Sequence, residues 1–364
     1  MKKIQFIEKV FSFLGYISNV IGTTVLLIIV GHLLLGVAIY VRHINRIETA
    51  ALPVYDNYPD EGEFFWKEHE RLRIHFEPYY HWRRDGFQGK YINISDDGVR
   101  HSVTLKYSKN AKKIFMFGGS TLWGSGTRDE HTIPSFLQSF LGKDYKIYNY
   151  GEHAYVSTQE INFLLHQLAN GNIPDAVIFY DGANDAYTGV YSPAIPRGIH
   201  NLRMENVNVF VQLYNTSNYK RLIDYFFKTT NKWDDEVSSK IKNNSSSVVE
   251  LYESHIKQVN ALGKEYSFKT FFFWQPYLFS GTRDTLPYEK AIVQNASPVF
   301  VESLRQVYLD AKNTFKNREN EQIFFFGDIF NQVREPIYMD WCHLGPNGNE
   351  IVARQMFDKI KDLL

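Results

Sequence analysis

The hydrophobic pattern of the chain begins with an uncharged stretch at residues 17–41, which contains no Asp, Glu, Lys or Arg. About 20 consecutive apolar residues suffice to cross a bilayer as a helix. A cleavable signal peptide has a shorter apolar region followed by small residues, whereas Tyr40 and Arg42 stand at the end of this one. The pattern therefore predicts an uncleaved transmembrane anchor over residues 17–41.

The charges that flank this stretch bear on its orientation. Three lysines precede it and two arginines follow it: Lys2, Lys3, Lys9, Arg42 and Arg46. Because positive charge is retained on the cytoplasmic side of a membrane, the count favours a cytoplasmic N-terminus over residues 1–16. The rest of the chain would then lie in the periplasm or outside the cell, attached to the membrane by this single helix.

The segment after the apolar stretch, residues 42–73, is polar and charged, with Pro53, Pro59 and an acidic run at 60–63. Such a composition is typical of a linker. We therefore expect a stalk that ends in a short helix near residues 64–73.

Residues 74–110 form a lead-in to the region that follows. The alternation at residues 91–94, followed by Asp-Gly at 97–98, predicts a β-hairpin. Three arginines lie in this lead-in: Arg83, Arg84 and Arg100. They have two interpretations, since they could bind an anionic group or could form ion pairs and contact solvent.

Strand patterns and helix patterns alternate from residue 111 to the end of the chain. The predicted strands are short apolar runs at residues 113–117, 145–150, 175–180, 269–274 and 322–326. The predicted helices have apolar residues at helical spacing and occupy 132–141, 157–169, 246–264, 298–315 and 347–363. This alternation indicates an α/β fold with a doubly wound, mostly parallel, five-stranded sheet. Residues 187–247 interrupt it, so we expect an insertion there, with a helix near 217–229, which shapes a substrate pocket or forms a surface excursion.

The composition excludes some classes of protein. The chain has 40 Lys and Arg against 40 Asp and Glu, so no basic excess is available to neutralise the phosphates of a nucleic acid. Cys342 is the only cysteine, which excludes an internal disulfide. Neither a CxxC nor an HExxH motif is present to predict a zinc site.

Four short polar blocks follow predicted strands or precede the last helix. They are 118–121 (Gly-Gly-Ser-Thr), 149–153 (Asn-Tyr-Gly-Glu-His), 180–185 (Tyr-Asp-Gly-Ala-Asn-Asp) and 340–343 (Asp-Trp-Cys-His). Each block alone is also explained as a turn or a helix cap. Because the carboxyl ends of parallel strands meet at one edge of a sheet, the blocks can converge in space, and their order along the chain is the specific signal.

The blocks supply the residues that ester chemistry needs. Ser120 is a candidate nucleophile, His343 the base that takes its proton, and Asp340 the acid that orients the imidazole. The oxyanion that forms on an attacked carbonyl needs preorganised donors. The candidates are the backbone N–H groups of Ser120 and Gly151 and the side-chain amide of Asn184.

The blocks resemble those of the SGNH hydrolase superfamily, the GDSL-like lipases and esterases, over residues 111–364. The matching positions are Ser120, Gly151, Asn184, Asp340 and His343. The resemblance implies a three-layer α/β/α flavodoxin-like sandwich and serine-dependent ester hydrolysis or acyl transfer, without a metal or a cofactor. The family usually has aspartate where this chain has Gly119; that aspartate is not the catalytic acid, so the triad interpretation is kept.

The predicted anchor narrows the choice of substrate, since it would hold the catalytic face near acylated polysaccharides of the cell envelope. We expect an esterase that removes an O-acyl group, in particular an O-acetyl group, from a cell-envelope or extracellular polysaccharide. The expected partners are an acylated glycan or another small ester, and the membrane. Three alternatives stay open: a polysaccharide O-acyltransferase with the same triad, a lipid esterase or lysophospholipase, and a non-catalytic membrane-tethered scaffold.

Overall fold

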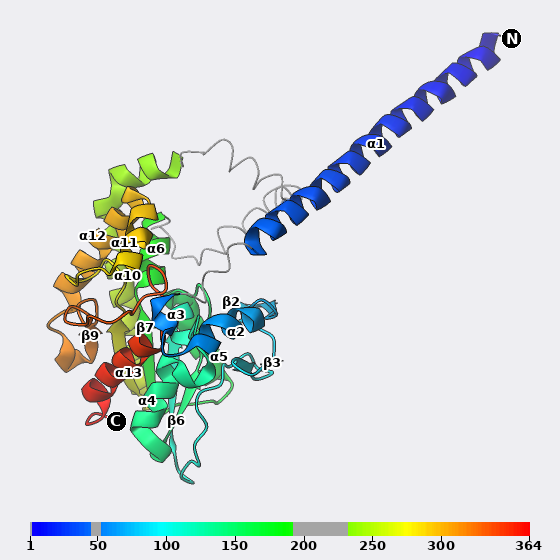
Figure 1. The fold of residues 1–364 in the computed structure, drawn as a ribbon. Helices are drawn as coiled ribbons and strands as arrows, with labels where there is room; N and C mark the ends of the chain where they lie inside the picture. Colours follow the sequence, from blue (N-terminus) through cyan, green and yellow to red (C-terminus); the bar gives the residue numbers. More distant parts are fainter. Residues whose placement is uncertain (1, 45–51, 192–231) are drawn as a thin grey trace. The chain divides into compact units, whose positions relative to one another are not determined.

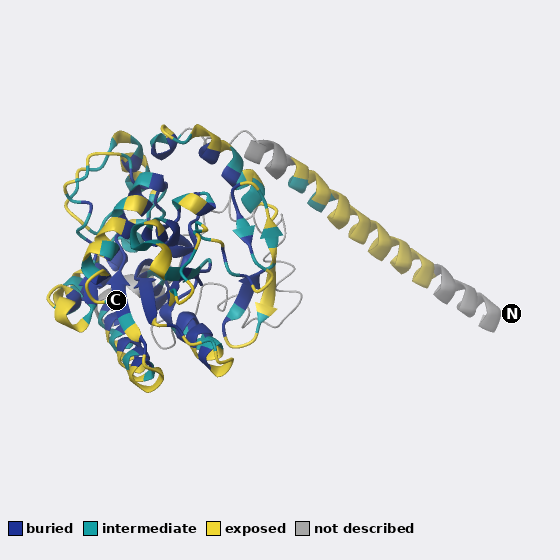
Figure 2. Ribbon diagram, turned by 90° about the horizontal axis from the view of Figure 1, so that it is seen from below, coloured by how far each residue is buried: buried dark blue, intermediate teal, exposed yellow. Residues whose placement is uncertain are grey.

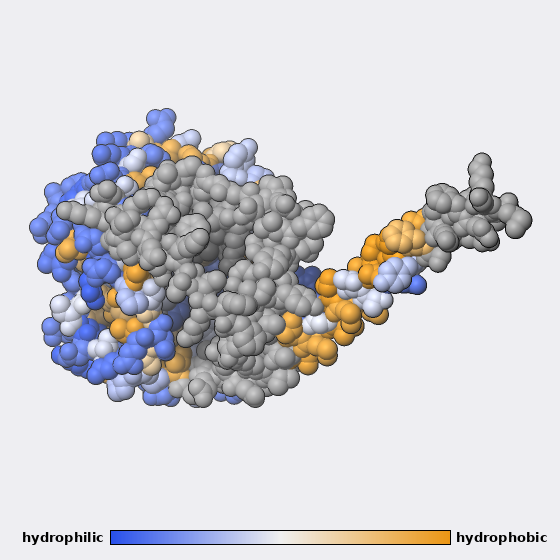
Figure 3. Space-filling model, turned by 90° about the horizontal axis from the view of Figure 1, so that it is seen from above, coloured by the Kyte–Doolittle hydropathy of each residue, from blue (hydrophilic) through white to orange (hydrophobic). Residues whose placement is uncertain are grey.

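The computed structural model describes residues 2–44, 52–191 and 232–364, and the chain divides into two compact units. The first unit comprises residues 1–48 with 205–230, and its described part is helix α1 (Lys2–Ile44). Residues Phe13–Val37 of α1 have a mean hydropathy of 2.4, and this stretch is long and apolar enough to cross a membrane. Its apolar side chains are exposed (Figures 2 and 3). Length and composition fit a membrane span and also a signal sequence.

The second unit, residues 49–204 with 231–364, is built on a five-stranded parallel sheet. Its strands are β5 (Lys112–Gly118), β6 (Tyr145–Asn149), β7 (Ala176–Asp181), β8 (Lys269–Trp274) and β9 (Ile323–Phe325), in the order β6-β5-β7-β8-β9 (Figure 1). The five predicted strands agree with these to within one residue at each end. Chain direction across the sheet reverses after β6, so the ends of β5 and β7 lie at the switch point where such folds bind ligands.

Helices cover both faces of the sheet, because each strand buries side chains on both sides. In β5, Ile114 and Met116 pack into one apolar cluster, whereas Phe115 and Phe117 pack into the other. The first cluster includes residues of α3 (Ser120–Trp123), α4 (Ile133–Leu141) and α13 (Pro346–Ile360). The second includes residues of α5 (Ser157–Ala169), α6 (Ala183–Tyr191), α10 (Lys232–Tyr266) and α12 (Pro298–Phe315). The fold is therefore the expected three-layer α/β/α sandwich.

The helix starts follow from local sequence. Thr132 caps α4, since its side chain accepts a hydrogen bond from the Ser135 amide, and Pro134 occupies the first turn. Ser297 caps α12 in the same way, with Pro298 at its first position. The predicted helices at 132–141, 157–169, 298–315 and 347–363 correspond to α4, α5, α12 and α13. The helix predicted near 64–73 corresponds in part to α2 (Pro59–His69). The prediction missed α3, α6 and α11 (Pro287–Asn295), and also the short 3₁₀ turns Pro53–Tyr55, Asp129–His131, Gly142–Asp144 and Glu319–Glu321.

The predicted insertion at 187–247 is described only in part. Helix α10 begins at Lys232 and continues as one helix through the predicted 246–264 segment. Residues 192–231, including the helix predicted near 217–229, lie outside the described residues.

From residue 52 onward, the segment predicted as a stalk is folded instead of forming a linker. Helix α2 begins at Pro59, earlier than the predicted helix, and Tyr55 and Phe65 are buried. The Tyr55 hydroxyl donates a hydrogen bond to the Gly126 carbonyl at 2.7 Å. A carboxylate oxygen of Glu61 accepts one from the Arg128 amide at 2.7 Å. The acidic and aromatic side chains whose composition predicted a linker therefore pack against the α/β domain.

The lead-in contains two hairpins. Strands β1 (Ile74–Glu77) and β2 (His81–Arg84) form one that the sequence did not predict. In the second, β4 (Asn93–Ile94) pairs antiparallel with the preceding strand β3 (Phe87–Gln88). After the predicted turn at 97–98, the chain forms only a single β-bridge, between Ile94 and Arg100. Arg100 also bridges Asn149 at the end of β6, so the lead-in reaches the edge of the main sheet.

Candidate active site

Ser120 lies in the sharp turn that joins β5 to α3, at the carboxyl edge of the sheet. The turn depends on Gly118, because a Cβ atom there would lie 2.7 Å from the Tyr180 carbonyl oxygen and 2.8 Å from Leu122 Cβ. Gly119 caps α3, which makes Ser120 the first residue of the helix. The first amides of a helix have no partner within the helix, so the Ser120 N–H belongs to this group.

The predicted serine, histidine and aspartate come together at this turn. His343 Nε2 lies 2.7 Å from Ser120 Oγ, and the two residues are 223 positions apart in the chain. On the other side of the ring, Nδ1 lies 2.7 Å from Asp340 Oδ2. With the neutral imidazole protonated on Nδ1, Ser120 donates to Nε2 and Nδ1 donates to Asp340, which is the direction that proton removal from the serine requires.

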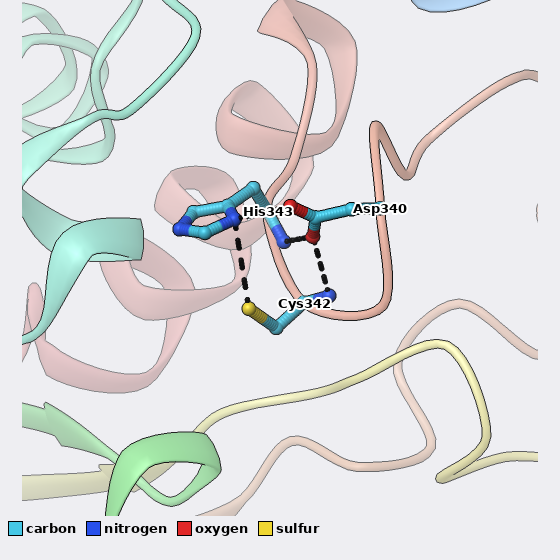
Figure 4. A group of neighbouring side chains, drawn as sticks. All are labelled: Asp340, Cys342 and His343. Atoms are coloured by element: carbon cyan, nitrogen blue, oxygen red, sulfur yellow. Dashed lines mark hydrogen bonds and ion pairs between the residues drawn. The ribbon is translucent and has the colours of Figure 1, made fainter. Parts of the chain in front are cut away.

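The loop that carries the acid and the base is held by its own backbone. The Met339 amide donates to the His343 carbonyl at 2.9 Å, and the Gly345 amide donates to the Ile337 carbonyl at 2.8 Å. Asp340 Oδ1 accepts hydrogen bonds from the amides of Cys342 (2.9 Å) and His343 (2.8 Å) (Figure 4). The carboxylate is therefore oriented independently of the imidazole that it binds.

Electrostatics favour the charged forms of the acid and the base. Burial lowers the pKa of His343, but the Asp340 carboxylate outweighs it and leaves that pKa well above its usual value. Burial raises the pKa of Asp340, but the His343 imidazolium and the two backbone N–H donors leave it below its usual value. The Asp340 side chain is 46% exposed, so water moderates both shifts. The pair thus stabilises the protonated form of the His343 imidazole.

Asp340, Cys342 and His343 offer atoms within 4.8 Å of one another, so these three could hold a metal ion. Such an ion would need the Cys342 thiolate, whereas burial raises the pKa of this thiol to about 11. It would also compete for the His343 nitrogen that binds Asp340. In the structure His343 Nδ1 lies 2.7 Å from Asp340, and the Cys342 thiol lies beside the same ring (Figure 4).

Two of the three predicted oxyanion donors, Asn184 and Gly151, donate hydrogen bonds within the protein. Asn184 Nδ2 donates to the Tyr155 carbonyl at 2.8 Å, which leaves its second hydrogen for another acceptor. This amide lies against the nucleophile turn, since a Cβ atom on Gly119 would overlap with it. The Gly151 N–H, predicted as a free donor, instead donates to Asn149 Oδ1 at 3.1 Å.

Several residues beside Ser120 were not identified from the sequence. Ser125 Oγ lies 2.7 Å from His153 Nε2, and the His69 ring stacks on His153 with centroids 5.1 Å apart. Burial lowers the pKa of both histidines, and the charge of His343 lowers it further. Both imidazoles are therefore neutral. His153 stands in the second polar block, where a signal existed, whereas nothing in the local sequence connects His69 to the site.

No protein-family model matches the chain, and no curated protein matches it. Among solved structures, it is similar to a putative arylesterase from Agrobacterium tumefaciens, with 16% identity and a TM-score of 0.38 over 70% of this chain and 100% of that one. It is also similar to a carbohydrate acetylesterase family member from Sinorhizobium meliloti (16% identity, TM-score 0.38, 69% and 98% covered). A third is a putative lipolytic protein of the G-D-S-L family from Desulfitobacterium hafniense (11%, 0.37, 68% and 99%). The solved structures similar to this chain thus include esterases and G-D-S-L proteins, the group that its motifs resemble.

Proposed function

We propose that the chain is a serine esterase in which Ser120 is the nucleophile, His343 the general base and Asp340 the residue that orients the base. The observation that carries this proposal is the continuous chain of two 2.7 Å contacts from Ser120 Oγ through the imidazole to the Asp340 carboxylate. This arrangement gives an otherwise weak hydroxyl nucleophile a base within hydrogen-bond reach.

The reaction follows from these positions. His343 Nε2 takes the proton as Ser120 Oγ bonds to the ester carbonyl carbon, and the carbonyl electrons move to its oxygen. The Ser120 N–H and the second Asn184 amide hydrogen stabilise this oxyanion. When the carbonyl re-forms, the alkoxide leaves with the proton from His343. A water molecule, deprotonated by the same imidazole, then releases the acid and regenerates Ser120.

For the substrate, we propose an O-acetylated polysaccharide at the cell envelope. The apolar span of α1 supports a location at a membrane. The larger number of lysines before the span favours residues 1–16 on the cytoplasmic side. The exposure of the site supports a bulky substrate, because the His343 and Asp340 side chains are 23% and 46% exposed. A site that takes a small ligand usually encloses most of it, whereas here the histidine and the aspartate beside the buried Ser120 stay partly open to a polymer-bound ester.

The catalytic proposal is tested with the full chain in detergent. The wild-type protein should hydrolyse p-nitrophenyl acetate and react with a fluorophosphonate probe, and Ser120→Ala should do neither. Ser125→Ala is the matched control, since Ser125 is a buried serine that contacts His153 rather than His343. Equal hydrolysis by wild type and Ser120→Ala, or probe labelling that persists in Ser120→Ala, would refute the nucleophile assignment.

The substrate proposal needs a separate measurement. An O-acetylated polysaccharide is incubated with the protein, and the released acetyl group is followed in the presence of a free sugar acceptor. Free acetate supports the esterase. Acetyl transfer to the sugar would refute the esterase and favour an acyltransferase with the same triad. Intact O-acetyl groups would refute the polysaccharide substrate.

A further inference from the structure

Trp123, the last residue of helix α3 that begins with Ser120, contacts two arginines of the lead-in. Its ring centroid is 4.7 Å from Arg84 Cζ and 4.1 Å from Arg100 Cζ. Trp123 is fully buried, and the two arginines are 6% and 1% exposed. Guanidinium groups at this distance from an indole make favourable cation–π contacts, which strengthen when water is excluded. Two cations of the lead-in thus contact the short helix that begins with Ser120.

Arg100 also binds the backbone that follows this helix. Its Nη1 donates to the carbonyls of Trp123 (2.9 Å) and Gly124 (2.7 Å), and its Nη2 donates to the Thr127 carbonyl (2.6 Å). Its Nε donates to Asp129 at 3.0 Å. The last carbonyls of a helix lack partners within the helix and favour a nearby cation. Arg100 therefore satisfies the carbonyls at the end of the helix that carries Ser120, where Gly124 adopts the left-handed cap conformation.

Arg84 acts on the other side of the turn. Its Nε lies 3.2 Å from a carboxylate oxygen of Glu152, and its backbone amide donates to the second oxygen at 3.2 Å. Glu152 is fully buried and directly follows Gly151, and it also accepts a hydrogen bond from the His153 amide at 2.7 Å. Strand β2 thereby holds the loop that leaves the end of β6.

Asn149 connects helix α3 with the loop that contains Gly151. Its Nδ2 donates to the Trp123 carbonyl at 3.3 Å, and its Oδ1 accepts from the Gly151 amide. The backbone of Arg100 forms a bridge with Asn149 itself. The lead-in, the nucleophile helix and the Gly151 loop therefore share one buried network around Trp123.

We propose that Arg84 and Arg100 are positioning residues for Ser120: they hold the nucleophile helix and the Gly151 loop in register through Trp123, so the lead-in is part of the catalytic apparatus. This inference rests on the proposed esterase function. The two arginines do not contact the reacting atoms, and their effect on the rate comes from where they place Ser120. A displacement of about 1 Å at a reacting group can lower the rate about 100-fold.

The test is Arg100→Lys in the full chain. Lysine keeps the charge but has no planar fork, so it cannot bind the three carbonyls and Asp129 together. We expect kcat for p-nitrophenyl acetate to fall about 100-fold, with KM changed less than threefold, circular dichroism unchanged and fluorophosphonate labelling slowed in proportion to kcat. In Arg100→Ala, added guanidinium at millimolar concentration should restore part of the lost kcat.

Arg283→Lys is the matched control. Arg283 is also a buried arginine, with an ion pair to Glu289 at 2.8 Å and hydrogen bonds to the carbonyls of Val333 and Glu335. The Arg283→Lys substitution should lower the melting temperature without the loss of kcat. A folded Arg100→Lys protein with wild-type kcat, or an equal loss of kcat in the control, would overturn the positioning role.

A variant that does not fold and an inactive wild-type protein have distinct consequences. If Arg100→Lys does not fold, Arg84→Lys is judged by the same kcat criterion, because Arg84 contacts the same indole. If the wild-type protein neither hydrolyses the ester nor reacts with the probe, the esterase proposal itself fails, and the positioning role fails with it.

Discussion

Gly119 provides a sharp test of the oxyanion site, because it stands where the resembling family usually has aspartate. Its backbone angles, φ −78° and ψ −158°, suit any L-residue, so Gly119→Ala introduces no backbone strain. A Cβ atom there would come closer than 3.0 Å to Asn184 Nδ2, whereas ordinary contact begins at 3.4 Å. The amide must therefore move by more than 0.4 Å, the difference between these two values. Asn184 is only partly buried, so it can rotate away.

The consequence should fall on the rate more than on stability. Loss of one oxyanion donor typically lowers kcat by about 10²–10³, or about 2.7–4 kcal/mol of barrier. The cost to folding is the Asn184 hydrogen bond to the Tyr155 carbonyl, about 1 kcal/mol. We therefore expect Gly119→Ala to remain folded, to bind p-nitrophenyl acetate with little change in KM and to lose most of its kcat.

A double-mutant cycle separates this mechanism from a general disturbance of the turn. In an Asn184→Ala background the overlap is gone, so Gly119→Ala should cost little more. Gly281→Ala is the matched steric control, since a Cβ atom there would overlap in the same way with the side-chain amide of Asn331. It should destabilise the fold without a loss of kcat. Wild-type kcat in folded Gly119→Ala, or full additivity with Asn184→Ala, would refute the reasoning.

Three further outcomes are expected. Because the pKa of His343 is raised, kcat/KM should rise with pH above 6.5 as the imidazole loses its proton, and a flat pH–rate profile would contradict this. The stabilisation of the folded state by the ion pair between His343 and Asp340 is fully present below pH 6.5 and is lost over the same pH range. Burial and the neighbouring Asp185 raise the pKa of Asp181 to about 8, so the folded state holds a proton that the unfolded state releases above about pH 4. Urea denaturation should therefore show stability falling from pH 5 to 9, and Asp181→Asn should reduce that fall by on the order of a few kcal/mol. Cys342→Ala should keep kcat within about threefold, because the thiol is neutral at pH 7; loss of probe labelling in that variant would instead make Cys342 a reacting group.

The sequence alone located the sheet and the candidate reacting groups. Each strand of a parallel sheet is a local run of apolar residues with helices on either side, so β5 to β9 could be read to within one residue. Parallel strands end at one edge, and for that reason polar blocks as distant as Ser120 and His343 could be expected to converge. The 2.7 Å contact between them agrees with this expectation.

Local patterns failed where a partner lies far away in the chain. Residues 52–69 had the composition of a linker, yet Tyr55 and Glu61 bind residues 126–131. Arg84 and Arg100 had two interpretations, and only the packed structure shows that their charges are paired with Glu152 and Asp129.

The tertiary structure also decided how the candidate donors are used. The sequence identifies which residues carry an N–H donor, but it does not show where each N–H points. That direction depends on the side chains that pack against the donor in the folded protein. Asn149 takes the N–H of Gly151, whereas the close approach of Gly119 brings the Asn184 amide to the nucleophile turn. The sequence by itself thus determined which residues can react, because periodicity and strand ends are local properties. Only the tertiary structure decided which groups hold them in place, since burial and charge pairing depend on contacts between distant segments.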